Sequence, residues 1–207
     1  VSSRPHWVRG FHTWMLGLAS QWMGVSGLHA NSVAPVLVSR EQGRRKSSFC
    51  RALMPDVLAR YYTDNLKLTS QGQAERMLAE MGLLNMDEFD KYAESKMPLL
   101  KNLMQMSVLN IRKAYQQNFR QLPRIASFIG TSNRFDLLTD PTGSRRFLCI
   151  EVKHDIDCTG IEHDRIFAQL KAELIAGRRS WFTKSEEEEL QRHNEAFYRV
   201  SLAEEAV

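Results

Sequence analysis

The chain has 207 residues, of which 43% are hydrophobic and 25% are charged. This is enough for one domain with its own core, and the composition excludes an intrinsically disordered chain. The most apolar stretch, residues 7–23, is interrupted by charged and polar residues, so no segment approaches the roughly 20 apolar residues of a membrane span. The net charge of +4 is unevenly placed: residues 101–146 carry eight Lys/Arg against two acids, and residues 183–207 carry three against seven. Such a basic segment is compatible with binding phosphates or nucleic acid, and also with an ordinary solvated surface.

The N-terminus and the cysteines indicate the setting of the protein. The chain begins with Val1 and shows no signal peptide, which predicts a piece of a longer protein. Cys50, Cys149 and Cys158 lack the spacing of a zinc site or a disulfide framework. A reducing cytoplasm is the expected location, with no contact with a membrane.

The first predicted element is a helix that ends at Gly24 and Gly27. Its apolar residues recur at helical spacing and form one face, which we interpret as core, or as a contact with a missing neighbour, rather than a base-stacking platform. The residues of this face are Trp7, Phe11, Trp14, Met15, Leu18 and Trp22.

The remaining pattern alternates short apolar runs with helical segments, which indicates an α/β fold with a mostly parallel sheet. We expect an N-terminal helical segment (1–30), a core (31–152) and a C-terminal helical segment of the same domain (153–207). Strands are predicted at residues 33–38, 83–86, 125–130 and 147–152. Helices are predicted from residue 48 to 54 and at 73–81, 97–106, 161–176 and 184–198.

The first motif follows the strand at 33–38. Lys46 and Ser47 open a helix after a loop that contains Gln42 and Gly43. In a phosphate-binding loop the backbone amides surround the phosphates, the lysine reaches the β- and γ-phosphates, and the serine hydroxyl binds Mg²⁺. A basic surface loop remains the alternative, because Arg40 and Arg45 stand where that motif has glycine.

Two further motifs suit the same chemistry. The strand at 83–86 runs into Asp87 and Glu88, which we assign to Mg²⁺ and to the attacking water, respectively. The segment Phe128-Ile-Gly-Thr-Ser-Asn133 ends in an amide that would orient this water or contact the γ-phosphate. Arg145 and Arg146 follow in a Gly-containing turn and suit charge stabilisation in the transition state, from the same or a neighbouring subunit. Taken singly, each motif is also compatible with a solvated strand end or turn.

The order of the motifs favours a nucleotide site. The gaps between them each have room for the crossover that a parallel sheet requires, about a dozen residues. All four motifs lie at predicted strand ends, where an open α/β sheet binds its ligand.

The combined pattern resembles the virulence-associated protein E family, in particular the branch found in Bacteroides-type bacteria. It consists of Gln42-Gly43 with Lys46-Ser-Ser-Phe49, then Asn85-Met-Asp-Glu-Phe89, Ile129-Gly-Thr-Ser-Asn133 and Gly143-Ser-Arg-Arg-Phe147. These proteins are P-loop ATPases related to superfamily-three helicases of phages, plasmids and integrated elements. The resemblance covers residues 7–197 and implies a three-layer, AAA+-like fold.

The resemblance also implies a function. The expected activity is ATP-dependent translocation or unwinding of single-stranded or forked DNA by a homo-oligomeric ring, beside a primase module, with ATP and Mg²⁺ as cofactors. By position, Gln42, Gly43, Arg45, Lys46, Ser47 and Ser48 would bind the nucleotide, and Ser47 and Asp87 the metal. Glu88, Asn133, Arg145 and Arg146 would be catalytic, while Arg112 and Arg124 fall where such proteins keep further basic residues.

The loop departs from the family pattern at Arg40 and Arg45. A Cβ at either position can obstruct the approach of the backbone to phosphate or a required positive φ. Arg44 and Arg45 would then hold phosphate through side-chain charge instead. The alternative function is a degraded P-loop module that binds nucleic acid or serves as an oligomeric scaffold without hydrolysis.

Overall fold

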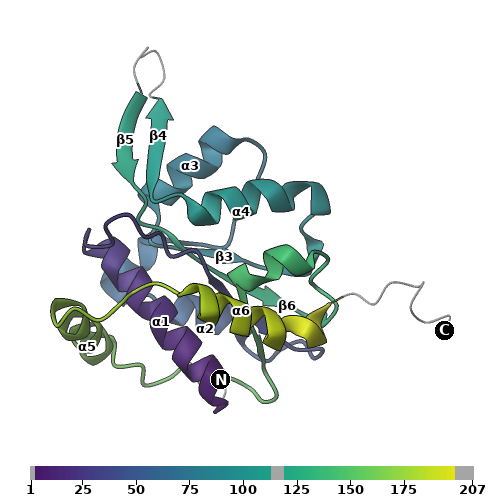
Figure 1. Cartoon of the computed structure of the whole chain (residues 1–207). Coiled ribbons are helices and arrows are strands. Elements are labelled where there is room, and N and C mark those ends of the chain that lie inside the picture. Colours follow the sequence, from purple (N-terminus) through teal and green to yellow (C-terminus); the bar gives the residue numbers. More distant parts are fainter. Residues whose placement is uncertain (1–2, 113–118, 199–207) are drawn as a thin grey trace.

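The computed structural model describes residues 3–112 and 119–198, and its centre is a five-stranded parallel sheet. The strand order is β2-β3-β6-β1-β7, so β6 lies between β3 and β1. This confirms the α/β fold with a mostly parallel sheet (Figure 1). The strands are β1 (Ala34–Val38), β2 (Tyr62–Thr63), β3 (Leu83–Met86), β6 (Ser127–Ser132) and β7 (Phe147–Glu151).

Helices cover both faces of this sheet. Every residue of β1, β3 and β6 is buried, so these strands show no alternation of buried and exposed residues. One face packs against α3 (Gln71–Glu80) and α4 (Met97–Gln105). The other packs against α1 (Pro5–Trp22), α2 (Lys46–Ala52), α5 (His163–Ile175) and α6 (Lys184–His193). The result is three layers, as Figure 1 shows.

Helix α1 confirms the apolar face predicted from its spacing. Trp14 is fully buried, and Gly24 follows the helix at a φ of +68°, a conformation that glycine adopts at little cost. No helix in the described ranges is long and apolar enough to cross a bilayer.

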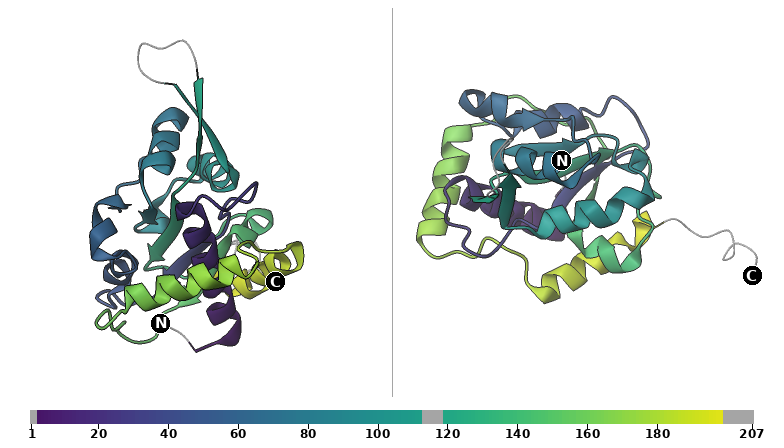
Figure 2. Two further views of the ribbon diagram at one scale, coloured as in Figure 1. Left: turned by 90° about the vertical axis from the view of Figure 1, so that its left-hand side faces the viewer. Right: turned by 90° about the horizontal axis from the view of Figure 1, so that it is seen from above.

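An antiparallel ribbon, β4 (Val108–Arg112) with β5 (Phe119–Pro123), was not predicted. It extends from the end of α4 and projects beyond the three layers, as both Figure 1 and the left view of Figure 2 show. The connecting segments also contain short 3₁₀ helices, η1 (Asp56–Tyr61), η2 (Phe89–Lys91), η3 (Glu94–Lys96), η4 (Pro141–Arg146) and η5 (Asn194–Phe197).

Strand register determines which residues share an edge of the sheet. Val38 pairs with Ser132 of β6 and with Glu151 of β7, so these strands end together at the carboxyl edge. At the opposite, amino edge, Ala34 pairs with Phe147. At this carboxyl edge β1 enters a loop and then a helix. β6 lies between β1 and β3, the strand that runs into the acidic residues. This is the P-loop NTPase arrangement that the resemblance implied.

Candidate functional site

The loop after β1 returns to the sheet through Lys46. This lysine is only 7% exposed, and its Nζ donates a hydrogen bond to Asn133 Oδ1 at 2.8 Å. Burial lowers the pKa of Lys46, while the carboxylates of Asp87 and Asp90 act in the opposite direction. The structure therefore brings together the predicted loop lysine and the predicted amide of β6.

The loop backbone adopts the conformation that usually requires glycine. Gly43 has a φ of +81°, and Arg45, immediately before α2, has φ 58° and ψ 27°, in the left-handed region. Only one of the two expected glycine positions is affected, because Arg40 is not among the described residues with positive φ. Arg45 thus holds a backbone conformation that is strained for a non-glycine residue.

The side chains of Arg44 and Arg45 differ in their contacts. Arg44 is bound to Glu41 and to Asp155, whose Oδ1 lies 2.9 Å from Nη1. The side chain of Arg45 is exposed and makes no hydrogen bond or ion pair with the described residues. Gln42 and Ser48 are exposed too. In this structure Arg44 neutralises acidic neighbours instead of offering a free guanidinium to phosphate.

Asp87 is the second part of the site and connects three elements. Its Oδ1 accepts hydrogen bonds from Ser47 Oγ at 2.7 Å and from Thr131 Oγ1 at 2.6 Å. Thr131 was part of the quoted motif but had no predicted role. Its hydroxyl also accepts a 3.3 Å hydrogen bond from the backbone N–H of Glu88. It therefore fixes the position of both acidic residues relative to β6.

The carboxylate of Glu88 points elsewhere. Glu88 has a φ of 50°, and its Oε1 pairs with Lys91 Nζ at 2.7 Å on the surface. To act on a water molecule at the phosphate, this side chain has to leave Lys91. An exposed pair three residues apart presents little resistance, since such pairs contribute about 0.5 kcal/mol or less.

Asp90 is a further acidic residue at the site that the sequence interpretation missed. It accepts a hydrogen bond from Ser132 Oγ at 2.7 Å, next to Asn133. The acid-rich run Asp87-Glu88-Phe89-Asp90 was the available signal, because one turn of η2 brings its first and last members to the same edge.

Arg145 and Arg146 do not share this edge. They form the end of η4, immediately before β7, and Phe147 pairs with Ala34 at the amino edge. Four strand residues, about 13 Å, separate that edge from Val38. The expectation that all four motifs lie at the ligand edge of the sheet is therefore wrong for the arginine pair. The reason is strand direction: the pair precedes its strand, whereas Lys46, Asp87 and Asn133 follow theirs.

The arginine pair is held by the C-terminal part of the domain. Arg145 Nε lies 3.6 Å from Glu187 of α6. Burial, and then Arg145, lower the pKa of Arg146, whose buried Nε has no hydrogen-bond partner among the described residues. Asn194 donates 2.8 Å hydrogen bonds to the backbone carbonyls of Ser144 and Phe147, on either side of the pair. The Gly-Ser-Arg-Arg-Phe motif is thus anchored from both sides.

Gly143 in this motif is required by a close approach. A Cβ built on it would lie 2.0 Å from Lys101 Nζ, which is paired with Asp140. Any larger residue would displace this lysine.

Within the described residues, the basic segment 101–146 does not form a continuous basic surface. Arg134 pairs with Asp136, and Lys101 with Asp140. Arg124 is 1% exposed and donates hydrogen bonds to five carbonyls, three of them at the end of α4. It is a structural residue rather than a ligand contact. Arg120 is exposed on the projecting ribbon, whereas the side chain of Arg112 lies outside the described part of the chain.

Two oxygen atoms of the site suit Mg²⁺. Ser47 Oγ and Asp87 Oδ1 are oxygen donors 2.7 Å apart. Mg²⁺ prefers oxygen ligands, keeps several waters, and is commonly held by one or two protein groups together with substrate phosphates. Among the described residues, no group of three or more His, Cys, Asp or Glu side chains could hold a metal ion by itself. The residues present therefore fit a metal that arrives with a nucleotide.

Two solved structures are similar to this chain at low sequence identity. The apo structure of the NrS-1 C-terminal region (305–718) aligns with a TM-score of 0.53 and 14% identity, over 89% of this chain and 47% of that one. A second, A-form apo structure of that region aligns with a TM-score of 0.48 and 17% identity, over 90% and 38%. This chain thus spans less than half of either structure. No curated protein matches it.

The family comparison agrees with the motifs. The model of the virulence-associated protein E-like domain matches residues 9–199, which include the loop at Lys46, both acidic residues and the arginine pair. The chain therefore belongs to the virulence-associated protein E-like domain family.

Proposed function

We propose that this domain binds and hydrolyses ATP with Mg²⁺ and couples hydrolysis to movement on DNA within a replication protein of a phage or mobile element. The observation that carries the proposal is the convergence of Lys46, Asp87 and Asn133 at the carboxyl edge. Three loops far apart in the sequence meet there through hydrogen bonds of 2.6 to 2.8 Å. A buried lysine beside an acid and an amide is an arrangement suited to a triphosphate.

Each residue has a defined task in this proposal. Lys46, now bonded to Asn133, exchanges that acceptor for the β- and γ-phosphate oxygens. Asn133, released from the lysine, orients the attacking water. Glu88 turns from Lys91 and accepts the proton of that water as it attacks. Ser47 and Asp87 would hold the metal, which would neutralise negative charge on the phosphates.

Arg145 and Arg146 act across a subunit interface in this proposal. Their position at the amino edge prevents them from reaching the phosphates of their own chain. A guanidinium supplied by the neighbouring subunit would stabilise the transition-state charge, as in other phosphoryl-transfer enzymes. Activity would then depend on assembly into a closed ring.

The ribbon β4–β5 supports contact with DNA. Arg120 is exposed on an element that projects from the body of the domain (Figure 2), and the sequence of this segment is basic. Nonspecific contact with phosphates requires cations that are not already paired. Arg134 and Lys101 do not meet this requirement, since each has an acidic partner.

The primary test measures ATP binding and phosphate release with Mg²⁺, with and without single-stranded DNA. Lys46→Ala is expected to abolish binding and turnover. Glu88→Gln is expected to retain binding and to lose turnover, because it removes only the proton acceptor. Lys184→Ala, on an exposed lysine of α6, is the matched control and should behave as wild type. Turnover that persists in Lys46→Ala would refute the proposal.

A second test measures DNA binding as a function of salt. Arg120→Ala should weaken binding to single-stranded DNA and reduce the slope of log K against log salt by about 0.7, the value for one phosphate contact. Arg134→Ala, which removes a paired arginine, is the control and should leave the slope unchanged. Equal effects of the two variants would show that the ribbon is not the contact.

A second candidate function is supported by Arg45. The left-handed conformation of this non-glycine residue favours a degraded P-loop that binds nucleic acid or holds an oligomer together without hydrolysis. Such a module would bind DNA with the same salt dependence in the presence and absence of nucleotide. Tight Mg-ATP binding with turnover would eliminate this alternative.

A further inference from the structure

The segment 194–198 holds the backbone of the arginine pair. Asn194 opens η5 and is 1% exposed, and its Nδ2 donates 2.8 Å hydrogen bonds to the carbonyls of Ser144 and Phe147. At the end of the segment, Tyr198 Oη donates a hydrogen bond to Ser144 Oγ. The two carbonyls lie on either side of the arginine pair. The segment 194–198 therefore determines where the backbone of the pair lies.

A single amide nitrogen makes both of the carbonyl contacts. An Asn side chain has two N–H donors, and both are used here on carbonyls three residues apart. Ser144 lies near the end of η4, where the carbonyls of a helix lack a partner within the helix. If either carbonyl moved, a buried polar group would lose its partner, which is unfavourable. Asn194 thus holds the end of η4 in one position.

Side-chain contacts within the described residues do little to fix the arginine pair. The side chain of Arg145 is 42% exposed, and its Nε lies 3.6 Å from Glu187 Oε2. Such an exposed ion pair is weak. The buried Nε of Arg146 has no hydrogen-bond partner among the described residues. The location of each guanidinium therefore depends on the backbone of η4, and so on the residues that hold this backbone.

The segment 194–198 is also attached to the loop that follows Asn133. Phe197 is 4% exposed, and its ring stacks on that of Phe135 with the centroids 5.6 Å apart and an interplanar angle of 11°. The carbonyl of Phe197 accepts a 3.0 Å hydrogen bond from the backbone N–H of Leu138. This second attachment fixes η5 itself. The segment thus joins the loop after the nucleotide edge to the arginine pair.

We infer that the segment 194–198 positions the arginine pair for use by a neighbouring subunit, with Asn194 as the positioning residue. The inference rests on the proposed function, in which the pair acts on a triphosphate bound to another copy of the chain. A guanidinium that stabilises a transition state has to be placed closely, since a misplacement of about 1 Å can lower the rate about 10²-fold. Asn194 acts through the backbone at the amino edge and not on the nucleotide.

The test measures ATP turnover in mixtures of two variants. Asn194→Ala should bind ATP as the wild type does and lose about 10²-fold in turnover, because its nucleotide edge is intact and its arginine pair is displaced. Lys46→Ala supplies an intact arginine pair without binding ATP. When equal amounts exchange subunits, about one interface in four joins the two in the productive order, so turnover should recover to about a quarter of the wild-type value.

A second mixture and a matched control distinguish positioning from general damage. Arg145→Ala and Asn194→Ala both lack a usable arginine, so their mixture should recover no turnover. Asn31→Ala is the control, because Asn31 is 4% exposed and its Nδ2 also donates two hydrogen bonds, to Trp14 O and Ser127 Oγ at 3.0 Å. These bonds go to α1 and β6. Asn31→Ala should therefore lower the urea midpoint, as Asn194→Ala does, and keep wild-type turnover.

The outcomes separate this inference from the proposed function. If Lys46→Ala restores turnover to Arg145→Ala but not to folded Asn194→Ala, the inference is overturned alone. Wild-type turnover in Asn194→Ala would overturn it too. If the wild type hydrolyses no ATP, the proposed function fails and the inference fails with it. The same holds for the interface step if Lys46→Ala does not restore turnover to Arg145→Ala.

Tyr198→Phe decides the question if Asn194→Ala does not fold. This variant removes only the hydroxyl that donates to Ser144 and keeps the ring. It should lose turnover without losing ATP affinity, and Lys46→Ala should restore it. Turnover equal to that of the wild type would overturn the inference.

Discussion

Most substitutions destabilise a protein, but the backbone strain at Arg45 predicts a substitution that stabilises it. Arg45→Gly should stabilise the protein. A non-glycine residue in the left-handed region costs roughly 1–2 kcal/mol, because its Cβ approaches the following carbonyl. Glycine relieves this cost, but its greater freedom in the unfolded chain costs about 0.4–1 kcal/mol. Because the Arg45 side chain is exposed and unpaired within the described residues, little else is lost.

The net gain is about 0.8 kcal/mol in the free energy of unfolding. Urea denaturation measures it directly. With an m-value of about 2 kcal/mol/M, the midpoint should rise by about 0.4 M at unchanged m. The same substitution should tighten ATP binding, because the loop amides can approach the phosphates without a Cβ between them.

Two controls separate backbone strain from loss of charge. Arg45→Ala removes the guanidinium but keeps the Cβ, so it should leave stability near that of the wild type. Arg44→Gly changes a residue without positive φ and breaks the pairs with Glu41 and Asp155, so it should destabilise. If Arg45→Gly lowers the urea midpoint, or if Arg45→Ala raises it equally, the argument from φ is refuted.

Three other predictions follow from contacts elsewhere in the fold. Arg124→Met should lower the free energy of unfolding by about 3 kcal/mol or more, because several buried carbonyls lose their hydrogen-bond donor. A urea midpoint close to that of the wild type would contradict this. Arg145→Ala should keep ATP affinity but lose about 10³-fold in turnover, and mixing it with Lys46→Ala should restore activity only if the arginine acts between subunits. Burial, and then His193, lower the pKa of His6 from 6.5, so the unfolded chain binds this proton more tightly. Stability should therefore fall as pH drops below 6.5, less so in His6→Phe, as thermal unfolding across pH would show.

The sequence predicted the elements whose pattern is set by burial. β3 spans Leu83–Met86 as its apolar run indicated, and α1 follows the spacing of its tryptophans. β4 and β5 were missed, because a ribbon outside the layers is not constrained to a strongly apolar pattern. β2 was missed because it has only two residues.

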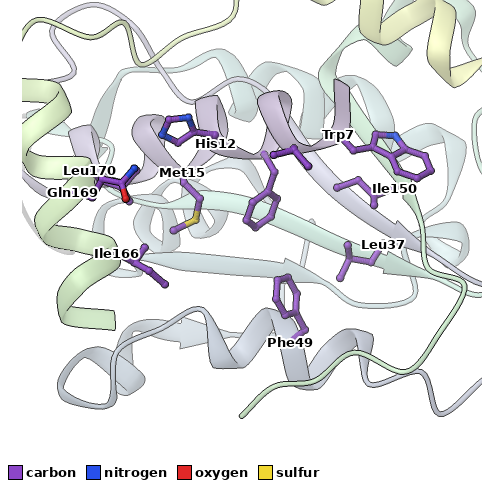
Figure 3. A pocket seen from close by; sticks show the side chains of 11 residues that line it. Trp7, His12, Met15, Leu37, Phe49, Ile150, Ile166, Gln169 and Leu170 are labelled. Carbon is purple, nitrogen blue, oxygen red and sulfur yellow. The ribbon is translucent and has the colours of Figure 1, made fainter. Parts of the chain in front are cut away.

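The convergence of Lys46, Asp87 and Asn133 was predictable from topology alone, since parallel strands that end together bring their following residues to one edge. The functions of these residues remain predictions. The contribution of Thr131 was not predictable, because its hydroxyl acts only through the register between β3 and β6. The apolar pocket lined by Phe11 of α1 and Phe49 of α2 (Figure 3) was even less accessible to sequence reasoning. Phe11 and Phe49 read as core residues of separate helices, and only the packing of α1 beside α2 leaves space between them.

The position of the arginine pair shows that strand direction, and not only the order of the motifs along the chain, decides which residues meet. The sequence interpretation assigned Arg145 and Asn133 to the same edge because both lie at a strand end. However, Arg145 precedes its apolar run, whereas Asn133 follows one. In a parallel sheet these positions lie on opposite edges, and the pairing of Phe147 with Ala34 shows the separation directly. An arginine on the amino edge can reach a triphosphate only in another copy of the chain. If Arg145 contributes to hydrolysis at all, the complete site therefore requires two subunits, and an isolated monomer should bind ATP without turning it over.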